Sequence, residues 1–103
     1  MKNAKNEFIK EIEDVGVAVH CAIVTYNYME YTLPVGYTDD DFNRFLDKLA
    51  FSYDSGYGAQ ELFGCIWYKD GTWSERGEYD GAEWWEYKCC PSIPDNLQGE
   101  ING

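Results

Sequence analysis

The architecture of this chain is decided by residues 61–89, which read ELFGCIWYKDGTWSERGEYDGAEWWEYKC. Two Asp-Gly pairs, Asp70-Gly71 and Asp80-Gly81, separate runs that are rich in Trp, Tyr, Phe and Ile. Asp-Gly between such runs is a strong hairpin signal, because a type I′ turn needs positive φ at both central positions. The stretch therefore predicts three antiparallel strands in a meander.

Two helices are predicted before the meander. Apolar residues at helical spacing over residues 3–14 indicate an amphipathic helix, and Gly16 is placed to end it. Thr38 opens the second helix, where it resembles a capping residue for Asp41. The apolar stripe of this second helix consists of Phe42, Phe45, Leu46, Leu49 and Tyr53.

Two strands lie between these helices. Residues 17–26 carry small and β-branched side chains on both parities, which is typical of a strand covered on both faces. Residues 30–35 form a second strand, and Pro34 places it at an edge of the sheet.

The expected order is α-β-β-α-β-β-β, which predicts an α+β fold. Its simplest packing is a single antiparallel sheet with two helices on one face and a C-terminal three-stranded meander. With 103 residues the chain is expected to form one domain over 1–94, followed by a polar tail over 95–103.

Two-residue loops at both turns would fix the register of the meander. Glu75 would then lie opposite Glu86, and Glu78 opposite Glu83, although a G1 bulge at a turn would shift this register. One face would carry Leu62, Ile66, Tyr68, Trp73, Tyr79 and Trp84, with Glu75 and Glu86 among them. The other would carry Phe63, Cys65, Trp67, Trp85, Tyr87 and Cys89, with Arg76.

The helices can cover only one of these two aromatic faces. We expect the core face to be the one with Phe63, Trp67 and Trp85, because its charged residues lie at its margin. Arg76 lies opposite Trp85 there, which allows a cation–π contact. Trp84 on the other face would lie over Gly77, which has no side chain to obstruct the ring.

The charge balance excludes several kinds of ligand. The chain holds 19 acidic and 8 basic residues, giving a net charge of −11. Nucleic acid and anionic membrane surfaces are therefore unfavourable direct ligands, whereas basic proteins are favourable ones. Residues 54–103 contribute −7, from ten acids and three bases. No apolar run is long enough to span a membrane and the start lacks a signal-peptide pattern, so we expect a cytoplasmic location.

The sequence predicts no catalytic residue, metal or cofactor. The four cysteines show no Cys-x-x-Cys spacing and are expected to be buried and reduced, the alternative being a metal site formed by His20, Cys21 and Cys65. His20 is the single histidine and is interpreted as structural. An enzyme acting on a small ligand would need a deep pocket near His20 or near residues 56–58.

The aromatic face that the helices leave uncovered is the candidate functional surface. Large rings fringed by charge are typical of a surface that binds another protein. The predicted partner is a basic nucleic-acid-binding protein. The predicted contact residues are Trp73, Glu75, Glu78, Tyr79, Asp80, Glu83, Trp84 and Glu86.

The same segment carries a resemblance to known proteins. The runs 70–73, 75–76, 78–81 and 83–86, which read DGTW, ER, EYDG and EWWE, resemble a segment of small acidic phage and prophage proteins of unassigned activity. In size and charge the chain is similar to phage anti-defence proteins, including anti-CRISPR and anti-restriction inhibitors and DNA mimics. The resemblance implies an inhibitor that occludes a host defence nuclease or effector complex in the host cytoplasm. The alternative is a structural module that forms a homodimer through its aromatic sheet face.

Overall fold

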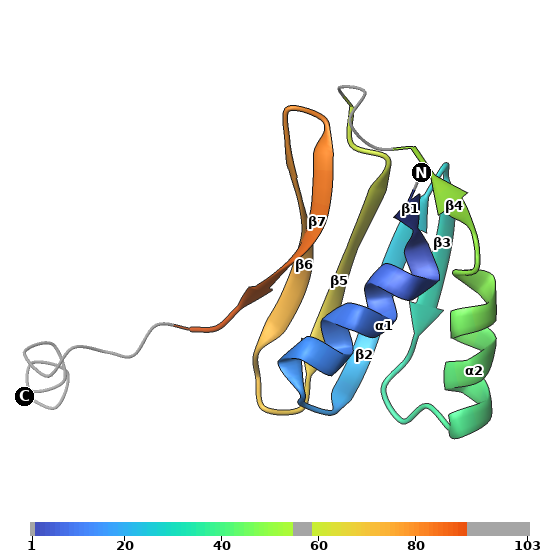
Figure 1. Cartoon of the computed structure of the whole chain (residues 1–103). Coiled ribbons are helices and arrows are strands. Elements are labelled where there is room, and N and C mark those ends of the chain that lie inside the picture. Colours follow the sequence, from blue (N-terminus) through green and yellow to red (C-terminus); the bar gives the residue numbers. More distant parts are fainter. Residues whose placement is uncertain (1, 55–58, 91–103) are drawn as a thin grey trace, which may run out of the picture.

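The computed structural model describes residues 2–54 and 59–90 and has the α+β architecture predicted from the sequence (Figure 1). Its main sheet is antiparallel, with strand order β3-β2-β5-β6-β7. The strands are β2 (Val19–Tyr26), β3 (Met29–Leu33), β5 (Leu62–Tyr68), β6 (Trp73–Tyr79) and β7 (Ala82–Lys88). The tail predicted for residues 95–103 lies outside the described residues.

A second, two-stranded sheet was not predicted. It pairs β1 (Lys2–Asn3) with β4 (Ser52–Tyr53), so the expectation of a single sheet was incomplete. Tyr53, assigned from the sequence to the stripe of the second helix, lies instead on β4. Strands of two residues are too short to produce a periodic pattern, and only the contact between distant segments reveals them.

Capping residues mark both ends of the first helix and the start of the second, whereas the second helix ends at Lys48, before the end of its predicted stripe. In α1 (Ala4–Val15) the Asn3 side chain accepts a hydrogen bond from the backbone N–H of Asn6 at 3.0 Å, and Gly16 closes the helix with φ +72°. In α2 (Asp39–Lys48) Thr38 and Asp41 form the predicted reciprocal capping box. These local interactions fix where each helix starts and therefore where its apolar stripe faces.

The hydrophobic core lies between the two helices and one face of the main sheet. Figure 1 shows α1 crossing this face and α2 lying beside β3. Phe8 of α1 packs edge-on against Phe45 of α2, with ring centroids 5.2 Å apart, and against Trp85 of β7 at 6.0 Å. The buried core consists of Ala4, Phe8, Val19, Ala22, Val24, Leu33, Phe45, Leu49, Tyr53, Leu62, Ile66 and Tyr68.

The second hairpin of the meander has the predicted register. Asp80 and Gly81 both have positive φ, at +52° and +86°, as a two-residue type I′ loop requires. The loop pairs Tyr79 with Ala82, and Gly77 lies opposite Trp84 as expected. A Cβ added to Gly77 would lie 3.0 Å from the Trp84 Nε1, so the indole covers this glycine as predicted.

The first hairpin differs from the prediction by one residue. Tyr68 donates its backbone N–H to the Thr72 carbonyl at 2.9 Å, and the Gly71 N–H is 3.1 Å from the Tyr68 carbonyl. Only Gly71 of the Asp70-Gly71 pair has positive φ, at +88°. This is a three-residue loop with a G1 bulge, and it pairs Trp67, rather than Tyr68, with Trp73.

This shift turns every side chain of β5 to the opposite face. Leu62, Ile66 and Tyr68 are buried under the helices, whereas Phe63 and Trp67 are exposed on the other side. The prediction of the core face was therefore correct for Arg76 and Trp85 and wrong for β5. Tyr87, which was also expected in the core, is 46% exposed. Gly64 accommodates Trp85 on the helix side, since an added Cβ would lie 3.0 Å from the Trp85 Cη2.

The central strand β2 is covered on one face only. Ala22 and Val24 are buried beneath the helices, while Cys21 and Ile23 are half-buried on the side away from them. His20 lies in a bulge, because Val19 pairs with Tyr68 while Cys21 pairs with the adjacent Trp67. The expectation of cover on both faces was therefore wrong.

Candidate functional site

The sheet face turned away from α1 and α2, here called the outer face, has a regular arrangement set by the strand register. Across β5, β6 and β7 a row of carboxylates lies between two rows of rings. The cross-strand neighbours are Trp67–Trp73–Lys88, Cys65–Glu75–Glu86 and Gly77–Trp84, with Phe63 beyond Gly77 on β5.

The rings of the outer face are accessible to solvent. The exposed fractions are 76% for Tyr79, 49% for Phe63, 42% for Trp67 and 37% for Trp84. Trp73, on the central strand β6 of the meander, is half-buried. A contiguous group of large apolar side chains on a surface is typical of a binding site for another protein.

The carboxylates at the centre of the outer face are in different environments. Glu75 accepts hydrogen bonds from Lys88 Nζ at 2.9 Å and from Trp73 Nε1 at 3.1 Å. These two bonds, that from Lys88 above all, lower the pKa of Glu75, and the same pairing raises the pKa of Lys88. Glu86, directly opposite Glu75, has no hydrogen bond or ion pair with any described residue.

Cys65 lies in the carboxylate row, in surroundings that favour its neutral thiol. Burial, and next the charge of Glu75, raise the pKa of its thiol to about 11, so the thiolate is scarce at neutral pH. All four cysteines are free thiols, but Cys21 and Cys65 are only half-buried and Cys89 and Cys90 are exposed, so the expectation that all four are buried was wrong. Among residues 2–54 and 59–90, no three potential ligands gather to form a metal site, so His20, Cys21 and Cys65 do not form one.

The fold divides the eight predicted contact residues among the outer face, the β6–β7 turn and the core. Register and strand alternation place five of them together on the outer face: Trp73, Glu75, Tyr79, Trp84 and Glu86. Asp80 and Glu78 are exposed at the β6–β7 turn, where Glu78 accepts a hydrogen bond from the Gly81 N–H at 3.0 Å. Glu83 is fully buried on the helix side and is not available to a partner, so its assignment to the surface was wrong.

Sequence reasoning missed Trp67 and Phe63 as members of the outer face. Both were assigned to the core because the Asp70-Gly71 loop was taken as two residues long. The available signal was that Asp-Gly also suits a type I turn followed by a left-handed glycine.

Glu83 belongs to a buried ion network that centres on Arg76. The side chains of Arg76 and Glu83 are 1% and 0% exposed, and their nearest nitrogen and oxygen are 3.5 Å apart. The Glu83 carboxylate also accepts hydrogen bonds from the backbone N–H groups of Glu61 at 2.8 Å and Leu62 at 2.9 Å. Arg76 and Glu83 were expected at the margin of the core and lie inside it.

Arg76 also contacts the N-terminal part of the chain. Its Nη2 donates to the Tyr53 hydroxyl at 2.7 Å, and its Nη1 is 3.7 Å from the Glu7 carboxylate. Tyr53 in turn donates its O–H to Glu7, and burial followed by this bond raises the pKa of Tyr53. The guanidinium carbon lies 5.3 Å from the centre of the Trp85 ring, which confirms the predicted cation–π contact. The network therefore ties α1 and β4 to the meander.

A second buried polar chain joins the sheet to α1. The Tyr68 hydroxyl is 2.7 Å from the Ser74 Oγ, which donates to the Glu11 carboxylate at 2.6 Å. Burial raises the pKa of Tyr68 to about 12, although its hydrogen bond with Ser74 acts in the opposite direction. The neutral phenol is therefore favoured by the folded protein.

This raised pKa predicts a loss of stability at alkaline pH. An unfolded tyrosine ionises near pH ~10, so between about pH 10 and 12 the unfolded chain releases a proton that folded Tyr68 retains. The free energy of unfolding should therefore fall as pH rises through this range. Tyr68→Phe should make the fall shallower, as measured by urea unfolding at several pH values. Tyr79→Phe, at an exposed position, is the matched control and should leave the pH dependence of the wild-type protein unchanged. If the free energy of unfolding of Tyr68→Phe falls with pH as steeply as that of the wild type, Tyr68 is not the group responsible.

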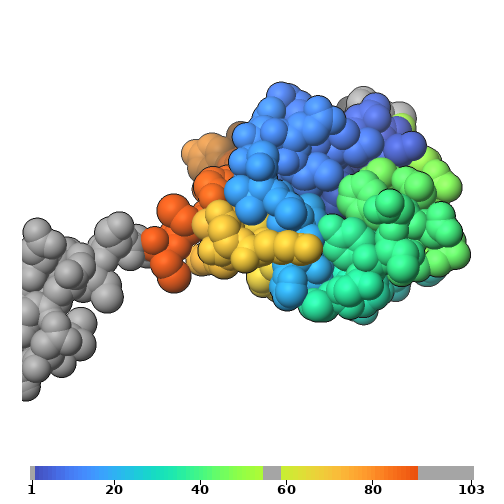
Figure 2. All heavy atoms as spheres, turned by 90° about the horizontal axis from the view of Figure 1, so that it is seen from below, coloured from blue at the N-terminus to red at the C-terminus, as the bar shows by residue number. Residues whose placement is uncertain are grey.

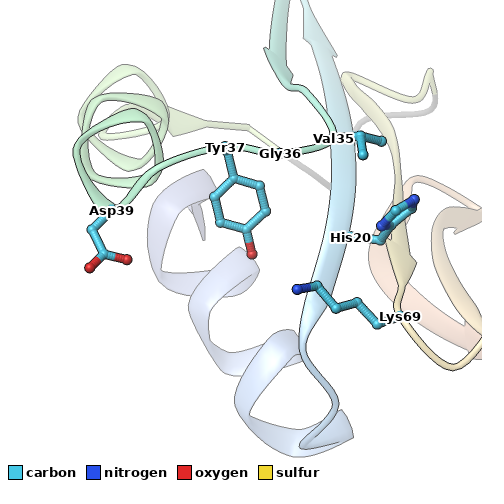
Figure 3. A pocket seen from close by; sticks show the side chains of 6 residues that line it. All are labelled: His20, Val35, Gly36, Tyr37, Asp39 and Lys69. Carbon is cyan, nitrogen blue, oxygen red and sulfur yellow. The ribbon is translucent and has the colours of Figure 1, made fainter.

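A hollow of about 700 Å³ lies at the end of the sheet where β2 begins. Figure 2 shows this end of the molecule, where the turn after β5 lies beside the start of β2 and the segment leading into α2. The lining residues are His20, Val35, Gly36, Tyr37, Asp39 and Lys69 (Figure 3).

No hydrogen bond or ion pair joins the side chains of the described residues around this hollow. In Figure 3, Lys69 and Tyr37 point into the same space, while His20 and Tyr37 lie on opposite sides of the β2 ribbon. Tyr37 donates its O–H to the Val19 carbonyl at 2.7 Å. His20 makes no side-chain hydrogen bond with a described residue, so nothing there orients it as a general base.

Comparisons with known proteins found no matching family model, no similar curated protein and no similar solved structure. Within the described residues, no helix is long and apolar enough to cross a membrane. The function is therefore inferred from the chemistry of the protein's own surface.

Proposed function

We propose that this protein is a non-catalytic inhibitor that binds and occludes a basic, nucleic-acid-handling protein through its outer face. The phage anti-defence proteins that it resembles suggest a host CRISPR effector complex or restriction nuclease as the target. The single observation that carries the proposal is the uncovered row of carboxylates between exposed rings on a sheet whose opposite face is already filled by the core.

The rings and the carboxylates have different roles in this mechanism. Trp67 and Trp84 supply large apolar anchors, which lose their contact with water when the partner docks. Glu86 on the face, with Glu78 and Asp80 at the adjoining turn, supplies negative charge that steers the encounter with Lys and Arg of the target. Occupation of the basic surface then prevents the target from binding nucleic acid.

The distribution of charge favours contact with a basic surface over close imitation of DNA. Glu83 is neutralised in the core by Arg76, and Glu75 is bonded to Lys88. The outer face therefore offers a few carboxylates among aromatic rings instead of a dense row of charges. Such a surface suits a partner that presents basic residues around apolar ones.

The test is inhibition of DNA cleavage by purified CRISPR effector complexes and restriction nucleases. The wild-type protein should inhibit at least one of them. Trp84→Ala combined with Glu86→Lys should raise the half-inhibitory concentration by about tenfold or more, since losing a central aromatic anchor costs about 2 kcal/mol or more. Asp47→Lys, on the exposed side of α2, makes the same charge change as Glu86→Lys and should leave inhibition unaltered. Circular dichroism establishes that each variant is folded.

Two results would contradict this proposal. Inhibition that survives the double substitution would show that the outer face is not the contact surface. Sedimentation of the protein as a dimer at micromolar concentration, with Trp67 and Trp84 protected in the dimer, would identify the face as the interface of a structural homodimer.

A further inference from the structure

The outer face carries a surplus of negative charge at one defined point. Glu75 and Glu86 are directly opposite each other on neighbouring strands, where side chains stand about 5 Å apart and like charges are destabilising. The cation beside them is Lys88, which is bonded to Glu75 at 2.9 Å. Two carboxylates and one ammonium leave a net charge of −1, centred on Glu86. A further cation would relieve this repulsion.

An aromatic ring lies at the same point. A Cβ added to Gly77 would lie 3.0 Å from the Trp84 Nε1 and 3.2 Å from the Glu86 Oε2. The indole and the carboxylate therefore meet above the same backbone position, and they can do so because residue 77 has no side chain. Trp84 is 37% exposed, so part of the indole is open to a ligand that also reaches Glu86.

No described basic side chain of the protein fills this position. Arg76 follows Glu75 in the sequence but points to the helix side. There it forms an ion pair with Glu83 and a hydrogen bond with Tyr53. Lys88 is held by Glu75 on the side of Trp73. The cation must therefore come from outside, and net charge complementarity favours a basic protein as its source.

Resting on the proposed function, we infer that Trp84 and Glu86 hold one arginine side chain of the partner. A guanidinium is planar, so it donates two parallel N–H bonds to a carboxylate and stacks on an aromatic face in the same pose. A lysine ammonium satisfies the charge but offers no flat surface to the indole. Arginine is therefore the cation that uses the carboxylate and the ring together.

The experiment is an NMR titration of the full chain with N-acetyl-arginine methylamide, observing the indole N–H signals. The signal of Trp84 should shift and saturate, whereas that of Trp85, whose Nε1 is buried on the helix side, should not move. The neutral analogue N-acetyl-citrulline methylamide should produce no shift, and the lysine analogue should bind more weakly. An unmoved Trp84 signal, an equal effect of citrulline, or equal affinity for lysine would overturn the inference.

Substitutions separate binding from structure. Glu86→Gln should weaken binding of the arginine probe by about fivefold, the value for an exposed charged contact. The same variant should unfold at a higher urea concentration, because the repulsion with Glu75 is removed; a residue retained for stability would show the reverse. Gly77→Ala should also weaken binding, by displacing the indole from its place beside Glu86. Asp47→Asn is the control with the same change in charge.

Failure of this inference is distinguishable from failure of the proposed function. If the probe binds as expected but no nuclease is inhibited, the arginine site stands and the proposed target class is wrong. If a nuclease is inhibited through the outer face while the probe leaves Trp84 unmoved, the inhibitor proposal stands and the arginine site is wrong.

Discussion

Arg76→Leu is expected to lower the free energy of unfolding by about 3–5 kcal/mol, because it leaves the Glu83 carboxylate buried without its cationic partner. Both side chains are almost completely inaccessible to water, so solvent cannot screen the lone charge. The substitution also removes the donor to the Tyr53 hydroxyl and the contact with the Trp85 ring. Urea unfolding followed by tryptophan fluorescence measures the loss.

Two further variants test the reason for this effect. Adding Glu83→Leu to Arg76→Leu removes the lone charge, but it also takes the acceptor from the N–H groups of Glu61 and Leu62, so stability should be recovered only in part. Lys10→Ala breaks the exposed pair with Asp14 and should cost about 0.5 kcal/mol or less. A loss below about 1 kcal/mol for Arg76→Leu would mean that the network does not hold the meander to the helices.

Phe8→Ala is expected to cost about 3–5 kcal/mol, the range for a buried phenylalanine replaced by alanine. The ring is fully buried and lies at the centre of the molecule, in contact with Phe45 of α2 and Trp85 of β7. Its removal therefore opens a cavity where the two helices and the sheet meet. The loss is measured by the shift of the urea unfolding midpoint at neutral pH.

Phe63→Ala is the matched control, since the same side chain is removed from the outer face. It should cost less than about 1 kcal/mol, because Phe63 is about half exposed. The comparison also tests the strand register, since the two-residue loop expected at Asp70-Gly71 would place Phe63 in the core. Equal losses for the two variants would contradict the one-residue shift of β5.

The two faces of the meander show how one strand contributes both to the core and to the proposed contact surface. Alternate residues of β6 point to opposite sides, so Arg76 enters the core while Glu75 and Gly77 face outward. The Arg76 guanidinium contacts Glu7 of α1, Tyr53 of β4 and Glu83 of β7. This leaves the outer face free to carry side chains that contribute little to the core.

The candidate site was predictable from sequence where local chemistry determined the geometry. Asp80-Gly81 specified a two-residue loop, and the loop alone placed Glu75 opposite Glu86 and Trp84 over Gly77. Trp67 was misplaced because Asp70-Gly71 is compatible with two loops that differ by one residue. Glu83 was misplaced because its cationic partner and the N–H groups that it caps come from distant segments.

The α+β class, the order of the larger elements, the caps at Gly16 and Thr38 and the second hairpin were all predictable from the sequence alone. Each of these depends on residues within a few positions of one another, such as Thr38 with Asp41. The tertiary structure decided the register of β5, the β1–β4 ladder and the burial of Arg76 with Glu83. Both the odd-numbered and the even-numbered residues of β5 include large apolar side chains, so the sequence pattern did not show which set faces the core. The choice between them came from packing Leu62 and Ile66 against the helices.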